Sequence, residues 1–396
     1  MGNLNIPSSV ISIGNGAFAY TDFNSISVAT DNAIYDSRNN CNAIIKTSSN
    51  QLIVGCTKTQ IPTSITAIGD YAFAGNENLS QVVFPNNLKS IGHYAFRNCN
   101  GITEIDFPSS LSSIGEYAFY GCTGLSKLSI PSNVTSIGTS AFGNNRLTSI
   151  VVDEKNTTFD SRNNSNSIIE KSSNTLIQGC KNTIIPSSIT SIGSGAFHGC
   201  TELTNIAIPN SVQSIGAYAF LRCEGLSNIE LPNSLQTIGF QAFDQCKFTK
   251  VVIPTSVKSI ANFAFYNTPL RNVTSLNTAP PSIESSTFGF TTKYTGNLVV
   301  PTGYLEDYKT ADGWKDFKNI QEAEQQQIEY TLGTVTYAIN QDAMSATIKH
   351  VSGSRSDLVI PESISYLGKT YTVTSIGEYN QEIKGETNVE IIPVSA

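Results

Sequence analysis

The chain has 396 residues, a net charge of −7 and only 14% charged residues. No run of apolar residues approaches the ~20 that a membrane-spanning helix needs, and Lys and Arg form no cluster of the kind that binds nucleic acid or anionic membranes. We therefore expect neither nucleic-acid binding nor membrane insertion by this chain.

The first ten residues, MGNLNIPSSV, contain neither the basic nor the apolar segment of a secretory signal. A repeated pattern begins almost at once, at Ile6. We therefore expect that the chain carries no export signal or anchor of its own.

A short pattern recurs along the chain with a nearly constant period. A proline recurs every 23 residues within two series, and an Ala-Phe pair keeps the same spacing. The prolines are Pro62, Pro85, Pro108 and Pro131, then Pro186, Pro209, Pro232 and, 22 residues later, Pro254. The phenylalanines are Phe73, Phe96, Phe119, Phe142, Phe197, Phe220, Phe243 and Phe265. This period is typical of leucine-rich-repeat solenoids, in which each coil packs only on its neighbours.

Two steps of the series are longer, from Pro7 to Pro62 and from Pro131 to Pro186, and each adds 32 residues to one period. The two added segments contain related sequences, YDSRNNCNAIIKTSSNQLIVGC and FDSRNNSNSIIEKSSNTLIQGC, offset by 124 residues. Each predicts two short strands around a polar turn. We therefore expect a larger duplicated unit, in which each insert adds a β-hairpin to the stack.

One repeat, CTELTNIAIPNSVQSIGAYAF from Cys200, shows the role expected for each position. The segment 203–208 predicts a strand with inward apolar side chains, and Pro209 ends it because proline donates no backbone hydrogen bond. Residues 212–215 are expected to pack from the opposite wall, and Phe220 to fill the core between coils.

These repeats resemble the BspA-like leucine-rich repeats, whose pattern is close to C-x-x-L-x-x-I-x-I-P-x-x-V-x-x-I-G-x-x-A-F. The resemblance covers roughly residues 6–320, with departures at Ile260-Ala261 and at Phe248. It implies a mainly β, right-handed solenoid of 23-residue coils, with a strand-lined concave face and short 3₁₀ or irregular segments on the convex side. Members of this family are mainly bacterial surface or secreted proteins, several implicated in adhesion, so we expect an extracellular or cell-surface location.

The end of the array, with the pattern VP…Y…GW…F…I, resembles the terminal coil of this family, and TADGWKDF is expected to form a short helix. After EAEQQQ, the segment IEYTLGTVTYAINQDAMSATIKHV alternates apolar and polar residues, which predicts antiparallel strands. We expect a solenoid over residues 1–324, including a terminal coil at about 271–324. Residues 325–396 are expected to form a small β-domain that resembles the lead-in to a further array.

The cysteines and histidines form no recognisable catalytic or metal-binding motif. Five cysteines follow the repeat phenylalanine by three residues, a position that elsewhere holds Asn or Thr; they are Cys99, Cys122, Cys200, Cys223 and Cys246. We expect buried free thiols, because the parallel Cβ directions of stacked coils make disulfide geometry poor. His93 and His198 lie at variable positions that we expect to be exposed. No metal and no cofactor are expected.

Strand positions between the inward residues are expected to face the concave surface. The binding candidates there are Gln81, Glu104, Asp106, Lys127, Asn205, Asn228, Glu230 and Lys250. None is aromatic and their charges are mixed, so we expect weak binding by this face alone, because hot spots usually need Trp, Tyr or Arg anchors. Its scattered carboxylates favour a solvated face over a catalytic pair.

Tighter recognition is expected at the inserts or at a row of tyrosines. The insert candidates are Tyr35, Asp36, Arg38, Phe159, Asp160 and Arg162. Their DSRNN motif could hold an ion or a sugar, although Asp and Asn more often stabilise turns. The row candidates are Tyr71, Tyr94, Tyr117 and Tyr218. The alternative for this row is a partly buried packing ladder.

Three hypotheses about function follow. The first is a non-enzymatic, monomeric adhesion or interaction scaffold that binds an extracellular protein or glycan of a host or neighbouring cell. The second is a structural spacer without a ligand, and the third is an enzyme. Exposed aromatic side chains clustered on one face would favour the first over the second. A cleft with perturbed carboxylates or histidines would favour the third.

Overall fold

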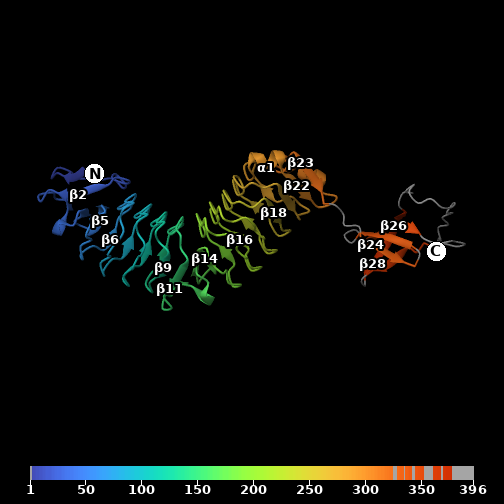
Figure 1. Cartoon of the computed structure of the whole chain (residues 1–396), viewed down its shortest axis with the longest axis horizontal. Helices are drawn as coiled ribbons and strands as arrows, with labels where there is room; N and C mark the ends of the chain where they lie inside the picture. Colours follow the sequence, from blue (N-terminus) through green and yellow to red (C-terminus); the bar gives the residue numbers. More distant parts are fainter. Residues whose placement is uncertain are drawn as a thin grey trace. The chain divides into compact units, whose positions relative to one another are not determined.

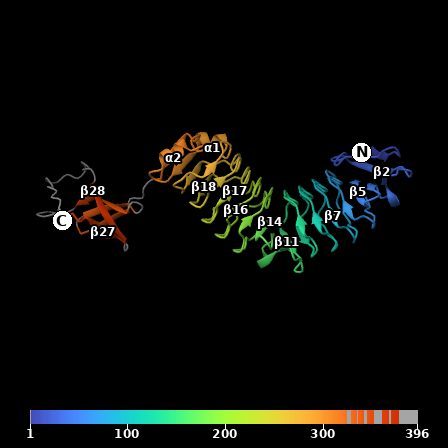
Figure 2. The same ribbon diagram turned by 180° about the vertical axis from the view of Figure 1, so that it is seen from behind.

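The computed structural model describes residues 2–323, 328–333, 335–340, 344–351, 360–366 and 369–376. The chain divides into two compact units, Met1–Glu322 and Ala323–Ala396. The first unit is a mainly β solenoid, whose coils lie side by side in one row (Figures 1 and 2). Each regular coil has the 23-residue length given by the spacing of the repeats.

Short parallel strands join successive coils at the Ser-Ile or related pair before the repeat glycine. In the first half these are β6 (Ala67–Ile68), β7 (Ser90–Ile91), β8 (Ser113–Ile114) and β10 (Ser136–Ile137). In the second half they are β15 (Ser191–Ile192), β16 (Ser214–Ile215), β17 (Thr237–Ile238), β19 (Ser259–Ile260) and β21 (Ser282–Ile283). Ser90 pairs with Ser113 and Ile91 with Ile114, so equivalent positions of neighbouring coils meet.

The strand expected at residues 203–208 does not form, although Leu203 and Ile206 are buried as predicted. Strands at the equivalent position occur only in some coils: β9 (Lys127–Ile130), β11 (Ser149–Val152), β18 (Lys250–Ile253) and β20 (Asn272–Ser275). The last three follow a loop that is one residue shorter, such as 145–147 in place of 200–203. Backbone pairing there therefore depends on loop length as well as on the apolar pattern. Two further parallel strands, β1 (Gly2–Ile6) and β2 (Phe23–Val28), begin the array.

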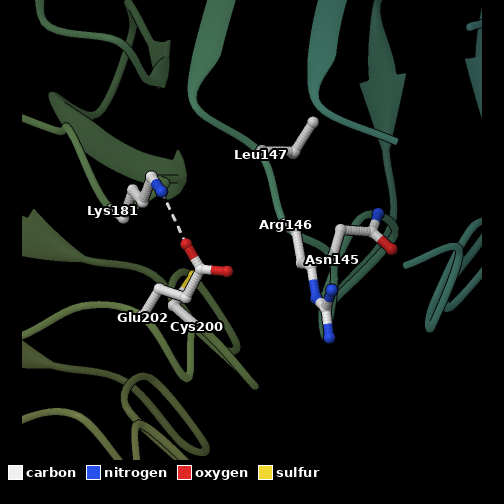
Figure 3. Close-up of a pocket in the computed structure, with 6 residues that line it drawn as sticks. All are labelled: Asn145, Arg146, Leu147, Lys181, Cys200 and Glu202. Carbon is white, nitrogen blue, oxygen red and sulfur yellow. Dashed lines mark hydrogen bonds and ion pairs between the residues drawn. The ribbon is translucent and has the colours of Figure 1, made fainter. Parts of the chain in front are cut away.

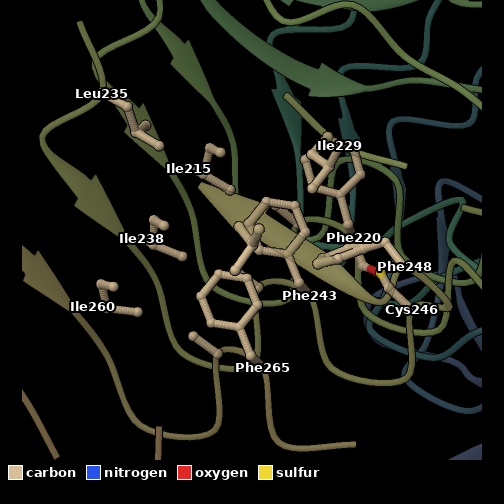
Figure 4. Packing of buried hydrophobic residues seen from close by; sticks show 14 of the residues in the cluster. Ile215, Phe220, Ile229, Leu235, Ile238, Phe243, Cys246, Phe248, Ile260 and Phe265 are labelled. Carbon is tan, nitrogen blue, oxygen red and sulfur yellow. The ribbon is translucent and has the colours of Figure 1, made fainter. Parts of the chain in front are cut away.

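The repeat phenylalanines form two continuous stacks inside the solenoid. Ring centroids are 4.9 Å apart for Phe73 and Phe96, and 5.0 Å apart for Phe197 and Phe220. This spacing follows the ~4.8 Å distance between strands. Figure 4 shows the second stack beside a row of isoleucines from the parallel ladder. Phe220 is fully buried, as predicted.

Both inserts form the expected antiparallel hairpins, preceded by a short strand and a 3₁₀ turn. The first contains β3 (Tyr35–Asp36), η1 (Arg38–Asn40), β4 (Ala43–Lys46) and β5 (Gln51–Gly55). The second contains β12 (Phe159–Asp160), η2 (Arg162–Asn164), β13 (Ile168–Glu170) and β14 (Thr175–Gln178). The last strand of each hairpin continues the parallel ladder, because β5 pairs with β6 and β14 with β15.

Each hairpin also contributes to the cores on both of its sides. In the second insert, Ile168 packs in the core that contains Phe119, whereas the adjacent Ile169 packs in the core that contains Phe220. This follows from the alternation of side chains along a strand. The inserts are therefore joints between separate core segments of one solenoid.

The terminal coil contains α1 (Phe290–Thr295), β22 (Asn297–Val300), α2 (Leu305–Thr310) and β23 (Asn319–Glu322). Trp314 is fully buried and donates its indole N–H to the Pro281 carbonyl at 2.8 Å, which closes the core. The helix expected over TADGWKDF is wrong. That segment is a turn with Gly313 at φ 75°, which lets the chain fold Trp314 inward after α2 ends.

The second unit contains a five-stranded sheet in the order β24-β25-β26-β28-β27. Its strands are β24 (Ile328–Leu332), β25 (Val335–Asn340), β26 (Ser345–Val351), β27 (Ser363–Tyr366) and β28 (Lys369–Ile376). The antiparallel pairing of β24, β25 and β26 confirms the strand prediction. Residues 377–396 lie outside the described part of the chain, and the similarity of this unit to the start of another array stays a prediction.

Candidate functional site

The predicted strand-face residues are exposed in the structure. All eight have freely accessible side chains, and none of them takes part in a salt bridge within the described residues. Lys127 pairs with Ser149 and Lys250 with Asn272 in the parallel ladders, so these side chains extend along rows of equivalent positions. The exposed apolar residues at neighbouring strand positions, such as Val83 and Val252, are aliphatic. This face offers polar contacts without an aromatic anchor.

The two aromatic residues of the inserts are not surface residues. Tyr35 is 5% exposed and Phe159 is 3% exposed, so the prediction that they present a binding surface is wrong. They occupy equivalent inward positions of β3 and β12, where an aromatic ring fills the core beside the hairpin. The Tyr35 hydroxyl accepts a hydrogen bond from the Ile13 backbone N–H at 2.9 Å.

The polar residues of the DSRNN motif bind one another. The Arg38 guanidinium donates to both oxygens of Asp36, at 2.8 and 2.6 Å, and to Asn50 Oδ1 at 2.8 Å. Burial raises the pKa of Asp36, but the hydrogen bonds from Arg38 and Thr47 outweigh it and leave the pKa below its ordinary value. Arg162 repeats these contacts with Asp160 and Asn174. These contacts support the turn-stabilising interpretation of the motif.

The predicted tyrosine row is half-buried and stacked. Ring centroids are 4.7 Å apart for Tyr71 and Tyr94, and 5.2 Å apart for Tyr94 and Tyr117, with nearly parallel planes. The Arg97 guanidinium lies over the Tyr94 ring. Tyr218 lies apart from this stack, beside His198. Because the ring faces contact one another, mainly ring edges are left for a partner, which is typical of a packing ladder.

His198, which we expected to be exposed, is buried at the second joint. Its Nδ1 lies 3.1 Å from Ser140 Oγ, and its Nε2 lies 3.2 Å from the Tyr120 hydroxyl. Burial lowers the pKa of His198 to about 4, with further contributions from Arg222 and Arg97. A serine beside a histidine resembles part of a nucleophilic site. However, Ser140 is only 2% exposed and His198 only 5%, so a substrate has no access to the pair. Among the described residues, the imidazole has Ser140 and Tyr120 as hydrogen-bond partners and no carboxylate.

A small pocket lies near this joint, lined by Asn145, Arg146, Leu147, Lys181, Cys200 and Glu202 (Figure 3). Lys181 and Glu202 form an ion pair of 2.5 Å. The pocket holds about 10 Å³, roughly the room for one water. It is therefore too small for a substrate.

The eight cysteines are buried and free. In the shared repeat position, Cys99 Sγ lies 3.1 Å from the Phe73 carbonyl of the preceding coil, and Thr268 Oγ1 donates to the Phe243 carbonyl at 2.6 Å. The position therefore requires a small donor, which explains why Cys, Asn and Thr share it. Burial raises the pKa of Cys122 to about 12. No group of three or more His, Cys, Asp or Glu residues suited to a metal occurs among the described residues.

An exposed aromatic group near α1 was not predicted from the sequence. Tyr266, Phe290 and Tyr294 are 42%, 66% and 49% exposed. The rings of Phe290 and Tyr294 stack with centroids 4.0 Å apart, and Lys318 Nζ lies 5.4 Å from the Tyr294 centroid. We call Tyr266, Phe290, Tyr294 and Lys318 the aromatic face. The i,i+4 spacing of Phe290 and Tyr294 was the available sequence signal.

The backbone places Tyr266 beside this helix. Phe265 pairs with Phe288 across adjacent coils, and a Cβ on Gly289 would collide with the Tyr266 carbonyl. Only glycine therefore permits this close approach, which brings Tyr266 next to the start of α1. The three rings thus come from two neighbouring coils on one side of the terminal part of the array.

Comparison with known proteins identifies the repeats. The family model for the BspA type leucine-rich repeat region matches in six copies, over residues 1–50, 44–171 and 167–295. No curated protein sequence matches this chain. None of the helices among the described residues is long and apolar enough to cross a bilayer.

Two solved structures have a similar fold. The pneumococcal vaccine antigen PcpA is 20% identical, with a TM-score of 0.55 over 82% of this chain and 79% of that one. A leucine-rich cell surface protein from Faecalibacterium prausnitzii A2-165 is 24% identical, with a TM-score of 0.55 over 82% of this chain and 80% of that one. The family model alone covers well over half of the chain. This chain therefore belongs to the BspA-type leucine-rich repeat family.

Proposed function

We propose that this protein is a non-enzymatic interaction scaffold, secreted or held at a bacterial surface, that binds an extracellular protein through the aromatic face. The surface location is supported by the family and by the two structural neighbours, one a vaccine antigen and the other a cell surface protein. The binding role rests on the structure of this chain.

The exposed aromatic group is the observation that carries the proposal. Aromatic rings supply large contact areas at low conformational cost and dominate hot spots. Tyr266, Phe290 and Tyr294 are exposed in two adjacent coils, and the last two stack on each other, whereas the exposed Tyr20 lies in the first coil. A spacer without a ligand has no need of such a group, because clustered exposed apolar side chains favour aggregation.

The chemistry of the partner follows from the same residues. Three rings would receive an apolar or aromatic protrusion, and Lys318, which forms no ion pair with another described residue, would pair with an acidic side chain at the rim. The eight strand-face candidates are proposed as a second surface that adds weak polar contacts. An enzymatic role has less support, because His198 is enclosed with Ser140 and Tyr120.

The test begins with a screen of the purified full chain against extracellular-matrix proteins, with glycans as a separate arm. For a protein partner, replacement of Tyr266, Phe290 and Tyr294 by Ala should weaken binding at least about 30-fold, equivalent to ~2 kcal/mol. The matched control replaces the exposed Glu104, Lys127 and Glu230 by Ala and should change affinity less than about threefold. Both variants must keep the wild-type melting curve. Loss of affinity in the control alone would refute the aromatic face as the anchor.

A further inference from the structure

A cavity of about 230 Å³ lies at the first joint, between the first coil and the first hairpin. It is lined by Ile13, Gly14 and Asn15 of the first coil, Gln51 and Ile53 of β5, and Gly69 and Asp70 after β6. Its volume exceeds that of several waters but is below the ~300–1,000 Å³ of pockets for drug-sized ligands. The cavity therefore fits one small ring.

The cavity exists because the ladder is interrupted at the joint. Gly69 donates its backbone N–H to the Leu52 carbonyl at 2.7 Å, so the coil after the hairpin is fully paired with β5. The corresponding corner of the first coil belongs to no strand, and Ile13 donates instead to the Tyr35 hydroxyl. The first coil and the hairpin thus contact each other through side chains and not through paired strands. The cavity is the space left between them.

The polar groups that line this space have free hydrogen-bonding capacity. Asp70 Oδ1 accepts from the His93 backbone N–H at 2.8 Å, and Oδ2 accepts from the Asn15 amide at 3.1 Å. Each oxygen keeps a lone pair, and the Asn15 amide oxygen keeps its acceptors. The Gln51 amide makes no hydrogen bond with the described residues. The cavity therefore presents the Gln51 amide, which can rotate and both donate and accept, together with the fixed acceptor oxygens of Asp70 and Asn15.

This lining selects a class of ligand. No Lys, Arg or His side chain lines the cavity, so nothing there attracts an anion. One carboxylate with amides is too few charged ligands for a metal, in agreement with the absence of metal-binding groups among the described residues. Ile13 and Ile53 add an apolar wall. A neutral sugar ring, with hydroxyls on its edge and C–H groups on its face, matches this combination.

The duplicated unit provides a second observation. Residues 124 positions later build the second joint with an equivalent hairpin and following coil, and Gly193 donates to the Leu176 carbonyl at 2.8 Å just as Gly69 does to Leu52. There, Thr139, Thr175 and Ser194 stand in place of Asn15, Gln51 and Asp70. The joint therefore forms without the polar trio Asn15, Gln51 and Asp70, so the trio is not required for the fold.

We propose that the cavity at the first joint binds one neutral sugar unit of a glycan, held by the polar trio. Asp70 and the Asn15 oxygen accept hydrogen bonds from sugar hydroxyls, and Gln51 both donates and accepts. The glycines at positions 14 and 69 leave room for the ring. The proposal does not rest on the aromatic face, which belongs to the opposite end of the array (Figure 1).

The test uses the full chain and a panel of neutral methyl glycosides, both hexopyranosides and N-acetylhexosaminides, with saturation-transfer NMR and calorimetric titration. At least one should bind with a dissociation constant on the order of 1 mM, as befits a small, open site. Replacement of the trio by the residues of the second joint, Asn15→Thr, Gln51→Thr and Asp70→Ser, should reduce that affinity at least about tenfold. If the triple variant has a lowered melting temperature, Gln51→Thr alone replaces it in the test. The Gln51 side chain makes no hydrogen bond with the described residues, so this change should not destabilise the fold.

Two controls complete the experiment. The reciprocal changes at the second joint, Thr139→Asn, Thr175→Gln and Ser194→Asp, should leave binding at the first joint unchanged or add a second site. The aromatic-face variant should retain sugar binding, which separates the two proposals. The cavity proposal is overturned if no neutral sugar gives saturation transfer, or if the trio variant binds as tightly as the wild type.

Discussion

At the scale of single residues, the repeat positions act as layers of one core. Phe220 is fully buried and stacks on both neighbouring phenylalanines, at 5.0 and 5.2 Å. The donor that follows each phenylalanine by three residues binds the carbonyl of the preceding coil, as Cys223 does with Phe197 at 3.1 Å. Apolar stacking and this hydrogen bond therefore set the register of successive coils together.

The first prediction concerns Phe220. Phe220→Ala should lower the free energy of unfolding by ~3–5 kcal/mol, because it leaves a cavity between two ordered rings. The loss should appear as early unfolding of neighbouring coils, since coupling in a solenoid is local. Thermal unfolding followed by circular dichroism measures it. A melting curve equal to that of the wild type would show that the proposed register is incorrect.

The second prediction concerns the pH dependence of the second joint. His198 has a pKa of about 4 in the fold, against an ordinary value of 6.5, because it is buried beside Ser140 and Tyr120 with Arg97 and Arg222 nearby. Its contribution to stability is therefore fully present above pH 6.5 and is lost as the pH falls toward 4. The size of that loss is on the order of 3 kcal/mol.

The measurement is the free energy of unfolding in urea at pH 7 and at pH 4. The free energy of unfolding of His198→Ala should be less sensitive to this pH change than that of the wild type. Alanine is also the residue at the equivalent position of the first joint, Ala74. The exposed His93→Ala is the matched control and should keep the wild-type pH dependence. Equal pH dependence of all three proteins would exclude His198 as the titrating group.

At the scale of elements, the sequence predicts the features that recur in every repeat. It does not predict the features that depend on contacts between one coil or hairpin and the next. The inward residues, the two hairpins and the strands of the second unit follow from apolar periodicity. Pairing at residues 203–208 could not be predicted from one coil, because it also depends on the neighbouring coil: β9 pairs with β11 after a loop of the same length, 122–125. The burial of Tyr35 and His198 depends on how a hairpin meets a coil, which no single repeat shows. The aromatic face joins residues of two coils through the close approach at Gly289.

The third prediction concerns the hairpin of the second insert as a joint between two cores. Ile168 and Ile169 are adjacent in β13, yet they belong to the cores on opposite sides. Replacement of either by Ala should cost ~2–5 kcal/mol. Amide hydrogen exchange should then show weakened protection in the coils that precede the second insert for Ile168→Ala. For Ile169→Ala, protection should weaken in the coils that follow the insert. The same pattern of lost protection in both variants would contradict the two-sided role of the hairpin.

At the scale of the whole molecule, the array combines a uniform core with a few places where the repeat is interrupted. The regular coils present a polar face of mixed charge, whereas the joints and the terminal coil carry the features that differ from coil to coil. The polar trio lies at the first joint, the buried Ser140 and His198 at the second, and the aromatic face at the terminal coil. Specific recognition is therefore expected where the repeat is broken, because a cavity and exposed aromatic side chains occur there, whereas the regular coils vary mainly in their polar and aliphatic surface residues.

The central claim is that the protein binds its partner through the aromatic face. The measurement that tests it most directly is amide hydrogen exchange of the full chain with and without the protein partner obtained from the screen. We predict added protection in residues 263–268 and 288–296, with little change in residues 203–208 and 226–231 of the strand face. Protection confined to the strand-face segments, with residues 288–296 unchanged, would contradict the claim.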